Sequence, residues 1–136
     1  MNTTAIIVST AIVSLTFSLN AMAHSPSKEE CVEAGDFIRN AALSRENGMD
    51  RTTFITKITD DFALIKSFPA ELRWFVQDTD DEEFLLKAAT EVFEHPTEPD
   101  IHQRNFLSAC IIRISQLKIT VDMIGPLGMK NPGNEQ

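Results

Sequence analysis

The sequence predicts an all-α protein: a small bundle of four to five helices whose first and last members are joined by a disulfide. Three observations support this prediction. Apolar residues recur at three- and four-residue spacing along the chain after residue 27. Capping patterns, glycines and prolines mark the ends of the periodic segments. The two cysteines, Cys31 and Cys110, fall on the first and the last of these segments.

The first 23 residues are predicted to be a secretory signal peptide. Residues 5–19 form an uncharged apolar run of 15 residues, which is shorter than the stretch of about 20 that spans a bilayer. Ala21 and Ala23 occupy the small positions that a signal peptidase reads, so we expect cleavage before His24. No Lys or Arg precedes the run, which leaves an uncleaved anchor as the alternative. We expect a periplasmic or secreted protein.

The charge of the chain indicates the kind of partner. All 20 acidic and 12 basic side chains follow residue 23, and the net charge is −8. Residues 24–124 are expected to form one domain, which is large enough to bury a modest core. Because phosphates would repel such a chain, we expect no nucleic acid and, after cleavage, no membrane as partner. A protein is the expected partner.

The first helix is predicted to begin after Ser27, which forms a capping box with Glu30, and to end at Gly48. Small residues share the face of Cys31, so this helix can approach the last one closely. In an exported protein, Cys31 and Cys110 most simply pair with each other. Closing their loop stabilises the fold by about 4 to 5 kcal/mol in the chain-entropy account. Two free thiols are the alternative.

Three further helices are predicted over residues 50–68, 69–77 and 78–95. The N-caps of the first and third are acidic or hydroxyl side chains: Asp50, and Asp78 or Thr79. The second begins on a proline, which suits the first turn of a helix. His95 precedes a proline and resists helical geometry, so the third helix ends there.

The last helix is predicted to run from Asp100 to about Ile124, before Gly125 and a proline. Its main apolar stripe comprises Phe106, Leu107, Cys110, Ile114, Leu117, Val121 and Ile124. A thinner stripe on the opposite side comprises Ile101, Ile112, Ile119 and Met123. Such a helix is either the central member of a bundle or the site of a protein contact, including a homo-oligomer. We favour the central position. Residues 125–136 are predicted to be a mobile tail.

An acidic run follows two aromatic residues in the middle of the chain. Five of the six positions 78–83 are acidic, and residues 60–100 hold 12 acids against three basic residues. We predict a partner-binding surface for a basic protein here. Its residues are Trp74, Phe75, Asp78, Asp80, Asp81, Glu82 and Glu83. The alternatives are that the acids offset a helix dipole and that the tryptophan belongs to the core.

Metal binding and catalysis have weaker support in the sequence. A periplasmic metal-binding protein that uses His24 with His95 or His102 is the alternative function. The sequence lacks paired Cys-x-x-Cys or His-x-x-x-His ligands. It also lacks a nucleophile elbow, a phosphate loop and a covalent haem motif. We therefore expect neither an enzyme nor a bound cofactor.

Several short stretches resemble small exported bacterial proteins of uncharacterised function. They are Cys31, Ala41-Ala42, residues 45–48, Phe68-Pro69 and residues 73–78. The resemblance implies export but no activity and no site residues. In size, acidity and paired cysteines the chain is also similar to periplasmic acid-stress chaperones and immunity proteins, without a matching motif. We therefore expect an exported, chaperone- or inhibitor-like protein-binding module.

Overall fold

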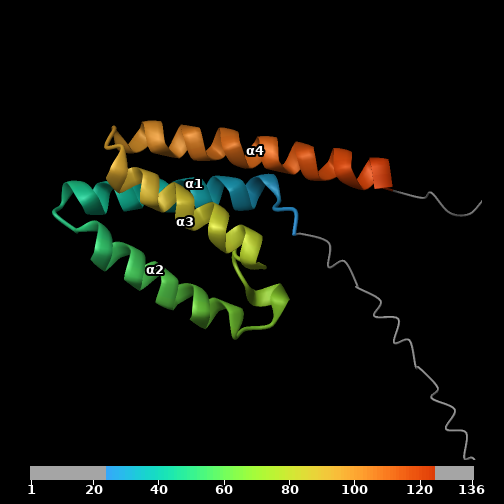
Figure 1. Cartoon of the computed structure of the whole chain (residues 1–136), viewed down its shortest axis with the longest axis horizontal. Coiled ribbons are helices and arrows are strands. Elements are labelled where there is room, and N and C mark those ends of the chain that lie inside the picture. Colours follow the sequence, from blue (N-terminus) through green and yellow to red (C-terminus); the bar gives the residue numbers. More distant parts are fainter. Residues whose placement is uncertain (1–23, 125–136) are drawn as a thin grey trace, which may run out of the picture.

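A computed structural model describes residues 24–124, which contain four α-helices and one 3-10 turn (Figure 1). The elements are α1 (Lys28–Glu46), α2 (Arg51–Lys66), η1 (Ala70–Leu72), α3 (Thr79–Glu94) and α4 (Pro99–Ile124). No strand occurs in this part of the chain, so the all-α prediction is confirmed. The predicted signal peptide (1–23) and tail (125–136) lie outside the described residues. Within residues 24–124, no helix has the length and apolar character needed to cross a membrane.

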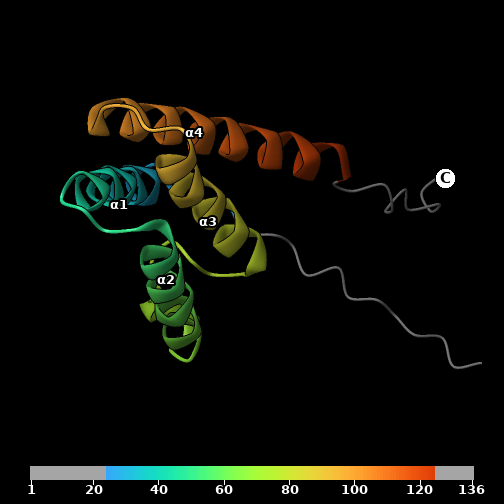
Figure 2. The ribbon, with the colours of Figure 1, turned by 60° about the vertical axis from the view of Figure 1, so that its left-hand side comes forward.

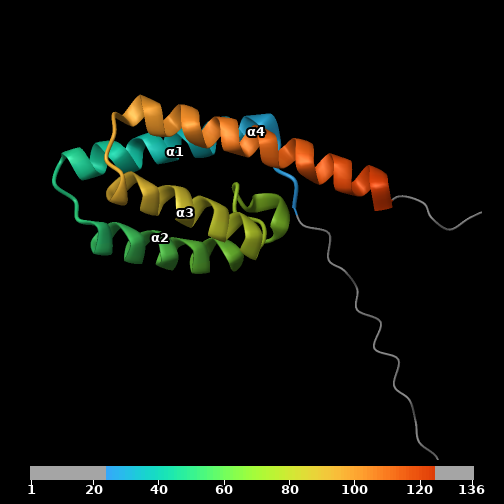
Figure 3. The same cartoon turned by 45° about the horizontal axis from the view of Figure 1, so that its top comes forward.

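The central helix of the bundle is α1. It packs against α4 along one side and against α3 along another, while α2 packs on α3 (Figure 3). Figure 2 shows α2 on the side of the bundle remote from α4. The buried face of α1 consists mostly of small residues: Cys31, Ala34, Gly35, Ile38, Ala41 and Ala42. These short side chains let two helices approach α1 at once.

The disulfide between Cys31 and Cys110 joins α1 to α4, as predicted. The two Cα atoms lie 5.8 Å apart and both residues are fully buried. One turn along α1, Gly35 faces α4, and a methyl group there would make an ordinary contact with Gln103 Cγ at 3.6 Å. The small face of α1 therefore positions the two sulfur atoms within bonding distance.

The predicted caps are present. Ser27 and Glu30 form both bonds of the capping box at the start of α1. Asp50 and Asp78 each accept a hydrogen bond from the backbone N–H three residues on. These side chains satisfy amide donors that the first turn of a helix leaves free.

The predicted helix over residues 69–77 is wrong in extent. The helical part is a single 3-10 turn, after which the backbone extends at Arg73. The neighbouring residues Phe75 and Val76 are both fully buried, whereas a helix would direct adjacent side chains about 100° apart. The Arg73 guanidinium donates to three carbonyls of this turn region, those of residues 66, 68 and 77. Core burial of two consecutive residues overrides the local preference for a helix.

The prediction that the last helix occupies the centre of the bundle is also wrong. The first part of α4 packs on α1, but the helix continues past the start of α1 (Figure 1). On the second stripe, Ile112, Ile119 and Met123 are exposed by 54%, 57% and 71%. The main stripe buries Phe106, Cys110 and Ile114. Only one side of α4 therefore contributes to the core.

Candidate functional site

The seven residues predicted to bind a partner lie around the N-terminus of α3, but they do not form one surface. Phe75 and Asp81 are fully buried. Trp74, Asp78 and Glu82 are partly buried, and Asp80 and Glu83 are exposed. A partner can therefore reach only part of this set.

Trp74 belongs to an aromatic layer between α1 and the segment before α3. Its ring lies 5.6 Å from that of Phe37 and 6.0 Å from that of Phe75, centroid to centroid. The indole N–H donates to the Glu33 carboxylate at 3.1 Å. Trp74 thus fixes this segment against α1, which is a structural role.

Asp81 forms a buried polar cluster with residues from three other parts of the chain. Its carboxylate lies 2.7 Å from the guanidinium of Arg113 on α4 and 2.7 Å from the imidazole Nδ1 of His24. It also accepts the backbone N–H of Gln77 at 3.0 Å. The Arg113 guanidinium lies over the Phe84 ring, 5.1 Å from its centroid. A buried carboxylate needs such partners, because desolvation without them is costly.

Asp78 completes this cluster at the N-cap of α3. Its carboxylate accepts the backbone N–H of His24 at 2.7 Å and that of Asp81 at 2.9 Å. Burial alone would raise the pKa of Asp78. The two hydrogen bonds and the positive charge of Arg113 outweigh burial, so the pKa lies below its usual value. The carboxylate is therefore ionised at neutral pH.

The exposed side of α3 carries a row of carboxylates, which we call the acidic ridge: Asp80, Glu83, Glu91 and Glu94. Their spacing of three, eight and three residues places them on one face of the helix. Lys87 is exposed in the same row. At the two ends of the helix, Glu94 pairs with Arg51 of α2, and Glu82, beside the ridge, pairs with Lys66. Asp80 and Glu83 have no ion-pair partner among residues 24–124.

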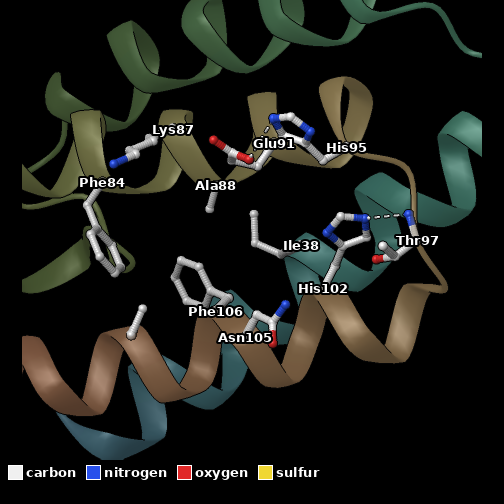
Figure 4. Close-up of a pocket in the computed structure, with 11 residues that line it drawn as sticks. Ile38, Phe84, Lys87, Ala88, Glu91, His95, Thr97, His102, Asn105 and Phe106 are labelled. Atoms are coloured by element: carbon white, nitrogen blue, oxygen red, sulfur yellow. Dashed lines mark hydrogen bonds and ion pairs between the residues drawn. The ribbon is translucent and has the colours of Figure 1, made fainter.

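A cleft opens between α3 and α4, beside the acidic ridge. Its volume is about 390 Å³ and its wall is mostly apolar. The lining residues are Ile38, Phe84, Lys87, Ala88, Glu91, His95, Thr97, His102, Asn105, Phe106 and Ala109 (Figure 4). Both helices pack on α1, and Ile38 of α1 forms the floor. Ala88 and Ala109 are too small to close the space between the helices. This volume lies in the range of pockets that hold ligands.

His102 and Arg45 shape the end of the cleft near the α3–α4 connection. Arg45 donates to the carbonyl oxygens of Val92 and Thr97 at 2.6 and 2.7 Å. His102 Nε2 accepts the backbone N–H of Thr97 at 3.2 Å (Figure 4). Burial, and to a smaller degree the charge of Arg45, lower the pKa of His102. His102 is therefore a neutral structural acceptor at neutral pH.

The structure does not bring the three histidines together. His24 contacts Asp81 at the start of α3, whereas His95 is the C-cap of the same helix. Fourteen residues separate Asp81 from His95, or about 21 Å at 1.5 Å per residue. Among residues 24–124, no group of three or more His, Cys, Asp or Glu side chains is arranged to hold a metal ion. The predicted pairing of His24 with His95 or His102 is therefore not formed here.

Two features of this region could not be predicted from the sequence. The cleft depends on how α3 and α4 sit on α1, which no local pattern reports. Its one local signal was the small size of Ala88, which lies among larger apolar residues of α3. The pair of Asp81 with Arg113 joins residues 32 positions apart, so the acidic run gave no sign that one of its members is buried.

The fold and these features define a class: a disulfide-bonded helical bundle with an apolar cleft along an acidic helix. Comparison with family models, with curated proteins and with solved structures finds no match for the chain.

Proposed function

We propose that this protein is an exported binding module that takes up a basic, amphipathic segment of a partner protein in the cleft between α3 and α4. One observation carries the proposal: an apolar cleft of about 390 Å³ lies directly beside the acidic ridge. An amphipathic helix inserts its apolar side chains into such a groove. Its basic side chains would then face Asp80, Glu83 and Glu91.

Charge complementarity selects the partner. The net charge of the chain is −8, and within the ridge four carboxylates outnumber the single Lys87. The carboxylates of the acidic ridge would attract a basic segment before contact and then fix its position along the cleft. They would repel an acidic segment. Apolar contacts in the cleft would supply affinity, and the ridge would supply specificity and a fast association rate.

Two features support the proposal that the module is exported. The buried disulfide between Cys31 and Cys110 is typical of oxidising compartments. The apolar run of residues 5–19, followed by Ala21 and Ala23, is typical of a cleaved secretory leader. The resemblance to small exported bacterial proteins agrees with this location. The proposal assigns no catalysis and no cofactor to the protein.

A peptide titration tests the binding proposal. The probe is a synthetic amphipathic helix of leucine and lysine, and its matched control replaces lysine with glutamate. We expect the lysine peptide to bind and the glutamate peptide not to bind. Converting the ridge (Asp80→Asn, Glu83→Gln, Glu91→Gln, Glu94→Gln) should weaken binding by about tenfold at low salt.

Two further variants complete the test: one fills the cleft, and the other removes acidic charge away from the ridge. Ala109→Trp should fill the cleft and abolish binding while the ridge stays intact. Asp60→Asn with Asp61→Asn removes two exposed carboxylates of α2 and should leave the affinity within about twofold. If the α2 variant weakens binding as much as the ridge variant does, or if Ala109→Trp binds normally, the cleft is not the site.

A further inference from the structure

The backbone nitrogen of His24 occupies an unusual position for a residue near the start of a domain. It lies 2.7 Å from Asp78 Oδ2, while the imidazole of the same residue lies 2.7 Å from Asp81 Oδ2. On its other side, imidazole Nε2 lies 4.0 Å from a carboxylate oxygen of Glu30. Residues ahead of a first helix are usually loosely held. His24 is held at both its backbone and its side chain.

The charges of this cluster do not balance. Asp78 and Asp81 supply two carboxylates, of which Asp81 is fully buried. Among residues 24–124, Arg113 is the one permanent cation in contact with them, at 2.7 Å from Asp81. An amide N–H at residue 24 adds no charge. A cationic nitrogen at the same place would pair with Asp78 and bring a second positive charge to the cluster.

We infer that the peptide bond between Ala23 and His24 is a processing site, and that the α-ammonium group released there pairs with Asp78 as a structural part of the fold. Hydrolysis by a signal peptidase adds one water across this bond. The Ala23 carbonyl becomes a carboxylate, and the His24 nitrogen becomes an amine that is protonated at neutral pH. This inference rests on the proposed export, but not on the proposed binding of a partner.

The distance between this nitrogen and Asp78 suits an ammonium group. Hydrogen bonds between a cationic nitrogen and a carboxylate are about twice as strong as neutral ones and have lengths near 2.7 to 2.9 Å. The positive end of the α3 dipole would disfavour a cation. Asp78, however, lies between this nitrogen and the first turn of α3 and accepts from both. The direct ion pair therefore outweighs the dipole.

The ion pair has a pH signature that a neutral hydrogen bond lacks. The reference pKa of an α-amine is about 7.7 to 8.0, and nearby carboxylates raise it in the folded state. Asp78 contacts this nitrogen directly. The other charged groups of the cluster are Asp81 and Glu30, which lie against the His24 imidazole, and Arg113, which pairs with Asp81. The stabilisation is present in full below about pH 7.7 and is lost as the pH rises through the folded-state pKa.

A stability cycle tests the ion pair. Two forms of the protein with the disulfide intact are compared. One begins at His24 and the other begins at Ala23. Each form is prepared with the native Asp78 and with Asp78→Asn. Asparagine retains the N-cap but removes the charge. We expect the unfolding equilibrium constant of the His24 form to be about tenfold smaller than that of the Ala23 form. This difference should vanish in Asp78→Asn and should shrink as the pH rises above about 8. Equal stabilities with Asp78 present, or an equal difference in Asp78→Asn, would overturn the ion pair.

Intact mass of the full-length chain, expressed with its leader and recovered outside the cytosol, tests the processing site. The mass of residues 24–136 with one disulfide is expected. A cut at any other bond would overturn the inference while leaving export intact. Recovery of the uncut chain in the membrane would overturn the processing site. The peptide titration above tests partner binding independently of processing.

Discussion

The carboxylate of Asp81 and the guanidinium of Arg113 form an ion pair of 2.7 Å that joins α3 to α4 inside the protein. Asp81 is fully buried and the Arg113 side chain is 15% exposed. Within residues 24–124, neither of the two contacting atoms has another hydrogen-bond partner. Removing Arg113 would leave the buried carboxylate of Asp81 without its guanidinium partner.

We therefore predict that Arg113→Met lowers the free energy of unfolding by about 3 kcal/mol. Urea unfolding followed by circular dichroism measures the change. Asp81→Asn combined with Arg113→Met removes both charges and should recover a large part of the loss. A double variant as unstable as the sum of the two single variants would show that the pair does not act as a unit.

The disulfide gives a second prediction. Replacing Cys31 and Cys110 together with alanine frees a loop closed over a separation of 79 residues and should cost about 4 to 5 kcal/mol on the chain-entropy account. Denaturant unfolding of the double variant provides the measurement. Reduction of the native protein serves as the control and should lower its stability by a similar amount. A loss below about 1 kcal/mol would mean that α1 and α4 hold together without the bond.

Much of the fold could be predicted because its determinants are local. The capping box of Ser27 and the cap of Asp50 need only neighbouring residues. The disulfide pairing followed from the number of cysteines and their helical faces. The central position of α1 could not be predicted in this way, because small residues such as Ala34 and Gly35 look unremarkable until two helices pack on them.

The candidate site was only partly predictable for the same reason. The run of acidic residues in the sequence corresponds to α3, but such a run does not indicate which acidic side chains point inward. Asp81 is buried because partners approach it from residues 24 and 113, far away in sequence. Phe75 is buried because the chain extends there rather than forming a helix. Tertiary contacts decided both outcomes.

The contact at Gly35 gives a third prediction. A β-carbon there would make ordinary contacts with α4, the nearest at 3.6 Å. Gly35→Ala should therefore stabilise the protein by about 0.5 to 1 kcal/mol through helix propensity. Gly35→Leu should instead destabilise it by about 1 to 3 kcal/mol because the longer side chain separates α1 from α4. Thermal unfolding of both variants checks the two signs, and a stable leucine variant would contradict the close packing.

The environment of His102 gives a fourth prediction. Burial and Arg45 lower its pKa in the folded protein, whereas Glu91 acts in the opposite direction. The unfolded chain binds a proton at this histidine near pH 6.5, but the folded chain does so only at lower pH. The stability linked to His102 is therefore complete above about pH 6.5 and declines as the pH falls below it.

His102→Gln keeps a hydrogen-bond acceptor for Thr97 but does not titrate. Its stability should change less than that of the native protein between about pH 7 and pH 5. Unfolding free energies at several pH values in this interval provide the measurement. Parallel pH profiles for the two proteins would show that protonation of His102 does not contribute to the pH dependence of stability.

The most direct test of the proposed function is photocrosslinking of the natural partner in cells that export the protein. A photoreactive residue replaces Ala109 in the cleft, and a matched control carries it at Thr56, which is exposed on α2. The account predicts that Ala109 captures a partner through a basic, amphipathic peptide and that Thr56 captures none. Equal capture at both positions, or crosslinked peptides from Ala109 that are acidic, would contradict it.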